Sequence, residues 1–248
     1  MIVDAGFVAL PIALLVCVYV SVASLIGAWQ RFPSLVLSAR YGLMTVPILL
    51  LISTLALVSA FVSHDFSVRY VVENSSLALP NIYTWVALYA GNSGSLLFIA
   101  TIFGVISVVA SVGLARKLPY TAPYATGVMA IVLTFFLGVI VFLANPLERL
   151  PVPALDGQGI NPLLIHFGMF IHPPVQMMGL ISVAIPFSIA MGALLAGRGG
   201  RDEWVDQGRF WGMVSWLILT TGLLLGSWWA YTILGWGCLL YTSPSPRD

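Results

Sequence analysis

Histidines are the residues of this chain best suited to bind a metal ion, because neutral imidazole is a common metal ligand. The sequence contains three of them: His64, His166 and His172. Pro173 and Pro174 follow His172 at the start of an apolar run. Proline disfavours the helical conformation for the residue before it, so we expect His172 just before a helix, facing water. The alternative interpretation is an interfacial histidine whose ring only hydrogen-bonds a loop carbonyl.

A second group that could bind a ligand is aromatic. Trp228, Trp229, Tyr231 and Trp236 lie within nine residues near the end of the last apolar run. Tryptophan and tyrosine gather at membrane surfaces because each ring combines apolar faces with one hydrogen-bonding edge, so an interfacial belt is one interpretation. A flat platform for a large aromatic macrocycle is the other.

The composition indicates what kind of structure must position these residues. Of 248 residues, 60% are hydrophobic and 8% are charged, whereas about 25% are charged in soluble domains. The mean hydropathy is +1.01. The chain is therefore predicted to be an all-α, polytopic membrane protein. A net charge of +1 without a basic run is evidence against a nucleic-acid partner.

Six apolar segments are long enough to cross a bilayer, which takes about 20 helical residues. They cover residues 6–28, 43–62, 94–114, 122–144, 173–196 and 211–234. Alternate connections hold most of the basic residues: Arg31, Arg40, Arg116, Lys117, Arg198, Arg201 and Arg209. The other connections hold only Arg69 and Arg149, so the positive-inside rule places the N-terminus outside. Loops 63–93 and 145–172, with all three histidines, are then predicted to lie on the outer face.

Several kinds of function are disfavoured by the sequence. The predicted centres of the spans contain no Asp, Glu, Lys, Arg or His, which proton and ion pathways usually need, so an ion-coupled transporter is disfavoured. Cys17 and Cys238 have neither metal-binding nor disulfide-framework spacing. The Gly-rich turn at residues 91–95 follows no strand and has no P-loop lysine, so we assign it to helix packing.

Five segments carry a resemblance to a known family. They are DFSVRYV at 65–71, GSLLF at 94–98, NPLERLPVPALDGQGINPLL at 145–164, IHPP at 171–174 and LTTGLLLGSWWAYTILGWG at 219–237. Their order and spacing resemble those of the CcmF/NrfE-type haem lyase subunits of cytochrome c maturation, which share a haem-handling superfamily with CcmC and CcsA. The resemblance covers nearly the whole chain and is highly specific as a set.

The resemblance implies a site for haem b. In the family, the histidine of the HPP motif is an outward-facing candidate ligand of the haem iron, and His172 occupies its position. Trp228, Trp229 and Trp236 are expected to begin the aromatic wall against which the porphyrin packs. A carbonyl or carboxylate should fix the tautomer of His172, with Asn161 or His166 as candidate partners.

The sequence departs from the family's pattern in two places. Tyr89, Asn92 and Ser93 stand where the family usually has Trp, His and Glu before GSLL. After Gly237 the family continues into its haem-holding, tryptophan-rich WWD segment, whereas this chain reads CLLYTSPSPRD. We predict that residues 1–237 are the N-terminal part of a haem-handling domain and that residues 238–248 are not native. The family's remaining haem-ligating histidines lie beyond this point.

The implied activity is attachment of haem to the CxxCH motif of an apocytochrome c at the periplasmic face of the bacterial inner membrane. No residue is predicted to be catalytic, because the reacting thiols belong to the substrate. The expected partners are apocytochrome c, a haem chaperone, a thioredoxin-like subunit and an apocytochrome-binding subunit. A truncated chain is expected to be inactive as a lyase. The alternative function is a non-enzymatic membrane scaffold or permease-like subunit, with the aromatic residues as a belt.

Overall fold

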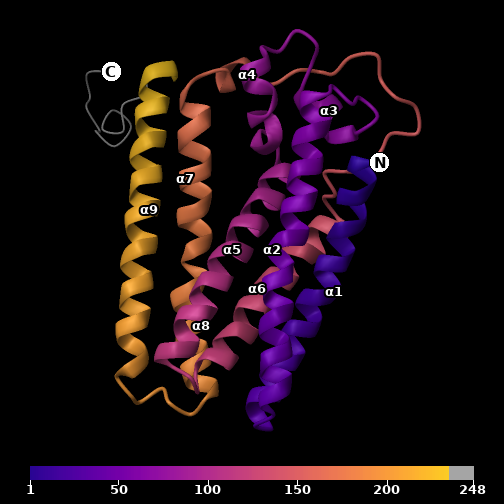
Figure 1. Cartoon of the computed structure of the whole chain (residues 1–248). Coiled ribbons are helices and arrows are strands. Elements are labelled where there is room, and N and C mark those ends of the chain that lie inside the picture. The colour runs from indigo at the N-terminus through magenta and orange to yellow at the C-terminus, as the bar shows by residue number, and fades with distance from the viewer. Residues whose placement is uncertain (235–248) are drawn as a thin grey trace, which may run out of the picture.

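Long apolar stretches of helix-forming residues build six spanning segments in the computed structural model, which describes residues 1–234 (Figure 1). The segments are α1 (Ile2–Trp29), α2 (Pro33–Val62), α5 (Asn92–Lys117), α6 (Ala122–Phe142), the pair α7 (Gly168–Ser182) and α8 (Ala184–Leu195), and α9 (Glu203–Leu234). The all-α class and the six helices that could cross a membrane are confirmed. α9 begins before the predicted span because the polar residues that precede Trp211 continue the helix.

The fifth span is interrupted at Val183, between α7 and α8. Pro186 stands in the first turn of α8 and has no N–H to donate to the carbonyl of Ser182. Its ring would also clash with that carbonyl in a continuous helix. In the last turn of α7, the Ser182 hydroxyl donates to the carbonyl of Gly179 at 2.8 Å. The two short helices therefore form one span with a local break.

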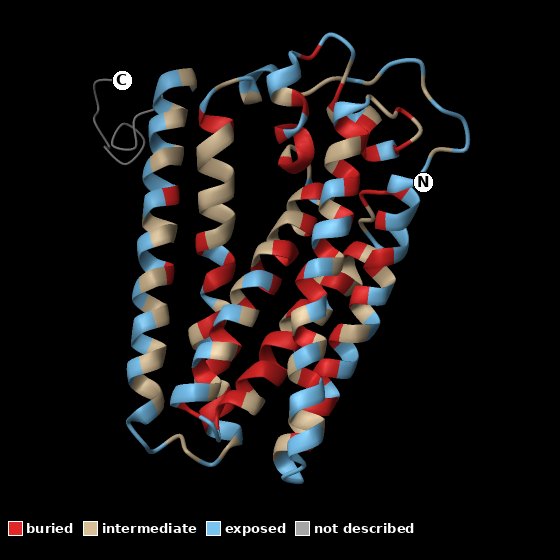
Figure 2. Ribbon diagram, viewed as in Figure 1, coloured by how far each residue is buried: buried red, intermediate tan, exposed pale blue. Residues whose placement is uncertain are grey.

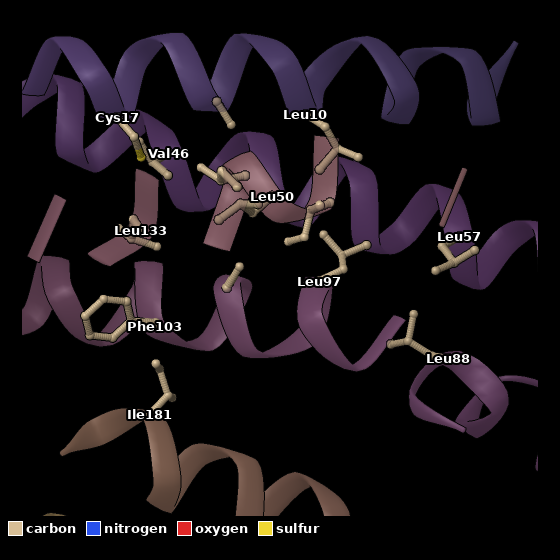
Figure 3. Packing of buried hydrophobic residues seen from close by; sticks show 14 of the residues in the cluster. Leu10, Cys17, Val46, Leu50, Leu57, Leu88, Leu97, Phe103, Leu133 and Ile181 are labelled. Atoms are coloured by element: carbon tan, nitrogen blue, oxygen red, sulfur yellow. The ribbon is translucent and has the colours of Figure 1, made fainter. Parts of the chain in front are cut away.

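The core lies between α1, α2, α5 and α6, where buried side chains such as Leu10, Leu50 and Leu97 meet (Figure 3). α1 and α2 share the most extensive contact. Gly6 permits their close approach, since a Cβ there would lie 2.5 Å from Cβ of Ala56. Figure 2 shows the buried residues concentrated in this part of the bundle. α7 contacts this core through α5, and α8 contacts it through α6.

α9 lies at the side of the bundle and packs mainly on α7 and α8 (Figure 1). It has the smallest buried share of the six spans. Many of its large apolar side chains are exposed: Phe210, Met213, Trp216, Leu217, Leu223, Leu224, Trp228 and Tyr231. A helix of this kind requires an apolar surrounding, as in a bilayer, where its backbone groups are satisfied within the helix.

The N-terminus and the segments 63–91 and 143–167 lie at one end of the bundle, called here the N-terminal end (Figure 1). These segments carry α3 (Arg69–Asn74), α4 (Asn81–Thr84) and the short 3-10 helices η1 (Val86–Tyr89) and η2 (Pro162–Leu164). Ion pairs hold them together: Arg149 binds Asp4 at 2.9 Å, and Arg69 binds Glu148 at 3.0 Å. That this end faces outward stays a prediction from the distribution of basic residues.

Candidate functional site

His172 lies inside α7, so the prediction that it precedes the helix is wrong. α7 begins at Gly168, about one turn earlier. Its first turn contains hydrogen bonds that span three residues, such as the bond from the N–H of Met169 to the carbonyl of His166 at 3.0 Å. The bias that a proline exerts on its predecessor is a preference, and the turn already formed at Gly168 overrides it. Neighbouring helices make such prolines tolerable in membrane spans.

The ring of His172 packs against α9 instead of facing water. Its Nδ1 lies 2.9 Å from the carbonyl oxygen of Gly222. Its ring centroid is 5.6 Å from that of Trp229, with 58° between the planes. Gly226 leaves room for it, because a Cβ there would lie 2.5 Å from Cε1 of His172. The half-buried ring is thus held between two glycines and a tryptophan.

The partner of Nδ1 determines the chemical state of His172. A carbonyl oxygen can only accept a hydrogen bond, so Nδ1 of the neutral ring carries the hydrogen and donates it to Gly222. Nε2 then keeps its lone pair. Nε2 is therefore the atom through which this residue could bind a haem iron. The predicted carbonyl partner exists, but it is Gly222 and neither Asn161 nor His166.

His166 has the opposite arrangement. The backbone N–H of Gly168 donates to Nδ1 of His166 at 3.0 Å, so the neutral ring carries its hydrogen on Nε2 and has no free lone pair. Its ring centroid is 5.7 Å from that of Trp228. Oδ1 of Asn161 accepts the N–H of Leu163 at 3.0 Å and caps η2. These two residues shape the segment that leads into α7.

An apolar hollow of ≈ 190 Å³ opens beside Gly226 and Trp229, two residues of α9 that contact the ring of His172. It is lined by Leu163, Gly226, Trp229, Ala230 and Ile233. Pockets that enclose a whole drug-sized ligand measure about 300–1,000 Å³. The hollow is therefore too small to enclose a whole macrocycle, and only one edge of such a ligand would enter it. Haem combines apolar edges with an iron that takes axial nitrogen ligands, so an apolar hollow that shares Gly226 and Trp229 with the surroundings of His172 fits its chemistry.

The predicted tryptophans differ in position relative to His172. Trp229 lines the hollow and contacts His172. Its Nε1 is buried and has no hydrogen-bond partner among residues 1–234. Trp228, at the next position along the helix, is 44% exposed and lies beside His166. Trp236 lies outside the described residues. Of the predicted wall, the structure therefore brings only Trp229 to the candidate ligand within its described part.

Comparison with known proteins identifies the family. Residues 89–240, more than half of the chain, match the family described as "Cytochrome C assembly protein". The chain belongs to this family. The CcmF protein of Pseudomonas aeruginosa is 37% identical over 98% of this chain, and the NrfE protein of Haemophilus influenzae is 30% identical over 97%. The solved structure of a protein named "Cytochrome c Heme Lyase CcmF" matches 96% of the chain with a TM-score of 0.82 and 27% identity.

The resemblance to CcmF and NrfE proteins is thereby confirmed. The chain spans 37% of the length of the Pseudomonas aeruginosa relative and 38% of the Haemophilus influenzae relative. It likewise covers 37% of the solved CcmF chain. The structure described here therefore corresponds to somewhat over a third of these cytochrome c assembly proteins.

This cytochrome c assembly protein offers no site for a bare metal ion in its described part. Residues 1–234 contain no group of three or more His, Cys, Asp or Glu side chains that could hold one. His64 lies two residues beyond the end of α2, with its ring centroid 5.9 Å from that of Phe66. A haem iron needs fewer protein ligands, because the porphyrin already supplies four nitrogens and leaves only the axial positions. A single well-placed histidine is compatible with haem.

Sequence reasoning missed the two glycines that hold His172. Gly222 and Gly226 are four residues apart and therefore lie on one face of α9. The signal was present in the sequence as GLLLG, a GxxxG pattern that allows close approach of membrane helices. The pattern does not reveal which helix, or which side chain, the glycines face.

Proposed function

We propose that this chain forms part of a haem lyase of the CcmF/NrfE type and holds haem at the N-terminal end of the bundle. One observation carries the proposal: the hydrogen bond from Nδ1 of His172 to Gly222 leaves Nε2 with a free lone pair, and two residues that contact this ring, Gly226 and Trp229, also line an apolar hollow. Membership of the cytochrome c assembly family supports haem as the ligand. So does the likeness to a structure named as a heme lyase.

The residues of the site have distinct tasks in this proposal. Nε2 of His172 would hold the haem iron, and the carbonyl of Gly222 orients the ring. Trp229 and the apolar residues around it exclude water from one edge of the macrocycle. Trp228 lies beside His166, in the segment that leads into α7. Each of these tasks is binding or positioning, because the chain supplies no reacting atom.

The covalent step joins two molecules that the protein brings together. A cysteine thiol of the apocytochrome CxxCH motif adds across a vinyl group of haem. The sulfur bonds to one vinyl carbon, the thiol hydrogen passes to the other, and no oxidant or reductant is consumed. Holding both reactants in one geometry supplies the rate enhancement that such an addition requires.

The proposal also places the site in the cell. The N-terminal end would face the periplasm from the bacterial inner membrane, because basic residues predominate at the opposite end, near Arg31, Arg116 and Arg198. Apocytochrome c would reach haem there, together with a haem chaperone and the thioredoxin-like and apocytochrome-binding subunits of the maturation system.

A chimera tests the function in cells. Residues 1–234 replace the matching part of the Pseudomonas aeruginosa CcmF protein in a strain that lacks it, and haem staining of gels measures covalent haem in c-type cytochromes. We expect the chimera to restore these cytochromes. We expect His172→Ala to reduce them to background, because the axial nitrogen is lost, while immunoblots show an unchanged amount in the membrane.

His166→Ala is the matched control, since this histidine lies in the same segment but has no free lone pair. It should leave cytochrome formation intact. Normal cytochrome formation in the His172→Ala chimera would refute the assignment of His172. A chimera that accumulates but forms no cytochromes, with or without His172, would favour the scaffold function.

A further inference from the structure

The glycine pair of α9 controls how His172 meets its hydrogen-bond partner. We propose that Gly222 and Gly226 form a backbone seat that locks His172 in its Nδ1–H tautomer and thereby sets its strength as an axial ligand. The second half of this inference rests on the proposed function. The first half concerns only this chain, so it can be tested without haem.

Gly226 sets how closely the ring approaches α9. A Cβ on Gly226 would lie 2.5 Å from Cε1, 2.9 Å from Nδ1 and 3.1 Å from Nε2 of His172. Three ring atoms at such distances from one point show that the ring lies directly against the helix backbone. The backbone of His172 is fixed within α7 by two following prolines. Any side chain at position 226 must therefore displace the ring.

Gly222 supplies the carbonyl that accepts the hydrogen bond from His172, and its lack of a side chain lets His172 reach that carbonyl. A Cβ on Gly222 would lie 2.7 Å from Cα and from Oε1 of Gln176. Gln176 follows His172 by four residues, so the two side chains lie on the same face of α7, the face that packs against α9. Because position 222 has no side chain, α7 comes close enough for Nδ1 of His172 to lie 2.9 Å from the Gly222 carbonyl.

The seat has a chemical consequence for Nε2. A carbonyl oxygen has two lone pairs, so that of Gly222 can accept both from His172 and from the helical N–H four residues later. A hydrogen bond from the second ring nitrogen raises the basicity of a ligating histidine and fixes its orientation. A more basic axial nitrogen stabilises ferric iron and so lowers its reduction potential.

Simple helix packing is the competing explanation, and the same helix pair offers controls for it. A Cβ on Gly179 of α7 would lie 2.5 Å from backbone atoms of Leu219 on α9, so Gly179→Ala disturbs the packing two turns away from His172. A Cβ on Gly212 of α9 would meet nothing within 4 Å. Gly212→Ala is therefore the neutral control.

Nitrogen-15 NMR of the histidine-labelled chain in detergent micelles reads the tautomer directly. The chain has three histidines, and His172→Gln identifies the signals of His172 by their loss. We expect a protonated Nδ1 and an unprotonated Nε2 at His172 in the parent chain, in Gly212→Ala and in Gly179→Ala. We expect Gly226→Ala to shift the population towards the Nε2–H tautomer. If His172 kept the parent tautomer in Gly226→Ala, or if Gly179→Ala shifted the tautomer equally, the proposal that the two glycines lock the tautomer would be refuted.

Titration of the same variants with haem separates this inference from the proposed function. Gly226→Ala should weaken haem binding by about 10- to 100-fold and raise the reduction potential, as loss of an outer-shell partner does at other metal sites. If Gly226→Ala bound haem with the affinity and the reduction potential of the parent chain, the glycine pair would not set the strength of His172 as a ligand. Failure of every variant, the parent included, to bind haem would refute the proposed function and leave the tautomer result standing.

Discussion

Two histidines six residues apart adopt opposite states because their Nδ1 atoms meet different partners. That of His172 faces the carbonyl of Gly222, and that of His166 faces the N–H of Gly168. The motif IHPP marked His172 as a candidate ligand through its resemblance to a family. Its tautomer could not be predicted, because the deciding carbonyl lies 50 residues away and belongs to the backbone.

Tyr70 shows the same dependence on distant backbone atoms. Its hydroxyl lies 3.0 Å from the carbonyls of Leu88 and Gly91 and accepts the N–H of Gly91 at 2.9 Å. Burial raises the pKa of Tyr70 to about 12. The sequence placed this residue in the family motif DFSVRYV without indicating its role. In the structure it joins α3 to the start of α5.

Tyr70→Phe is expected to lower the free energy of unfolding by about 1–3 kcal/mol, because the partly buried N–H of Gly91 loses its acceptor. Denaturant unfolding in micelles measures the change. Tyr41→Phe is the control, since Tyr41 is 60% exposed, and it should change stability by no more than about 0.5 kcal/mol. Equal stability of the two variants would show that the Tyr70 hydroxyl has no structural role.

At the scale of helices, hydrophobic length predicted every span, but a proline did not always mark the end of a helix. Pro11, Pro47, Pro173 and Pro174 all lie inside helices. Within residues 1–234, Pro186 stands just after the break at Val183, and Pro33 and Pro123 stand in the first turns of α2 and α6. In a membrane helix, neighbouring helices and polar side chains can satisfy the backbone groups that a proline leaves free. For this reason the two prolines after His172 did not mark the start of α7.

The contact between α1 and α2 depends on Gly6. A Cβ there would lie 2.5 Å from Cβ of Ala56 and 2.9 Å from Cδ1 of Leu147. Gly6→Ala should therefore lower the free energy of unfolding by about 1–3 kcal/mol, the usual cost of overpacking. Thermal unfolding in micelles, followed by circular dichroism, provides the measurement.

Gly138→Ala is the matched control, because a Cβ at Gly138 in α6 would meet nothing within 4 Å. It should be neutral or stabilising by up to about 1 kcal/mol, since alanine is the better helix former. If Gly6→Ala were as stable as Gly138→Ala, the close approach of α1 and α2 would not depend on glycine.

At the scale of the whole molecule, charge is distributed unevenly between the two ends. The two basic residues at the N-terminal end, Arg69 and Arg149, are paired with Glu148 and Asp4. Such exposed pairs contribute only about 0–1 kcal/mol each. Their main effect is to neutralise positive charge at this end, which agrees with the orientation predicted from the sequence. Composition and charge thus predicted the class of protein, whereas the pairing of α7 with α9 required the structure.

Orientation can be measured with single cysteines. In a background with Cys17 and Cys238 replaced by serine, Ala78→Cys and Gly200→Cys place one exposed thiol at each end of the bundle. A membrane-impermeant maleimide is applied to spheroplasts of a bacterium that expresses each variant. Labelling of Ala78→Cys in intact spheroplasts, and of Gly200→Cys only after lysis, is expected from the positive-inside rule. The reverse pattern would place His172 near the cytoplasmic face.

The most direct test of His172 as a haem ligand is titration of the purified chain with haem, followed at the Soret band. Saturable binding of one haem per chain is expected for the parent chain and for His166→Ala. His172→Ala should lose the band while circular dichroism shows an unchanged helix content, because the variant lacks the free Nε2 lone pair of His172. Equal affinity and an identical spectrum in His172→Ala would contradict the role of His172.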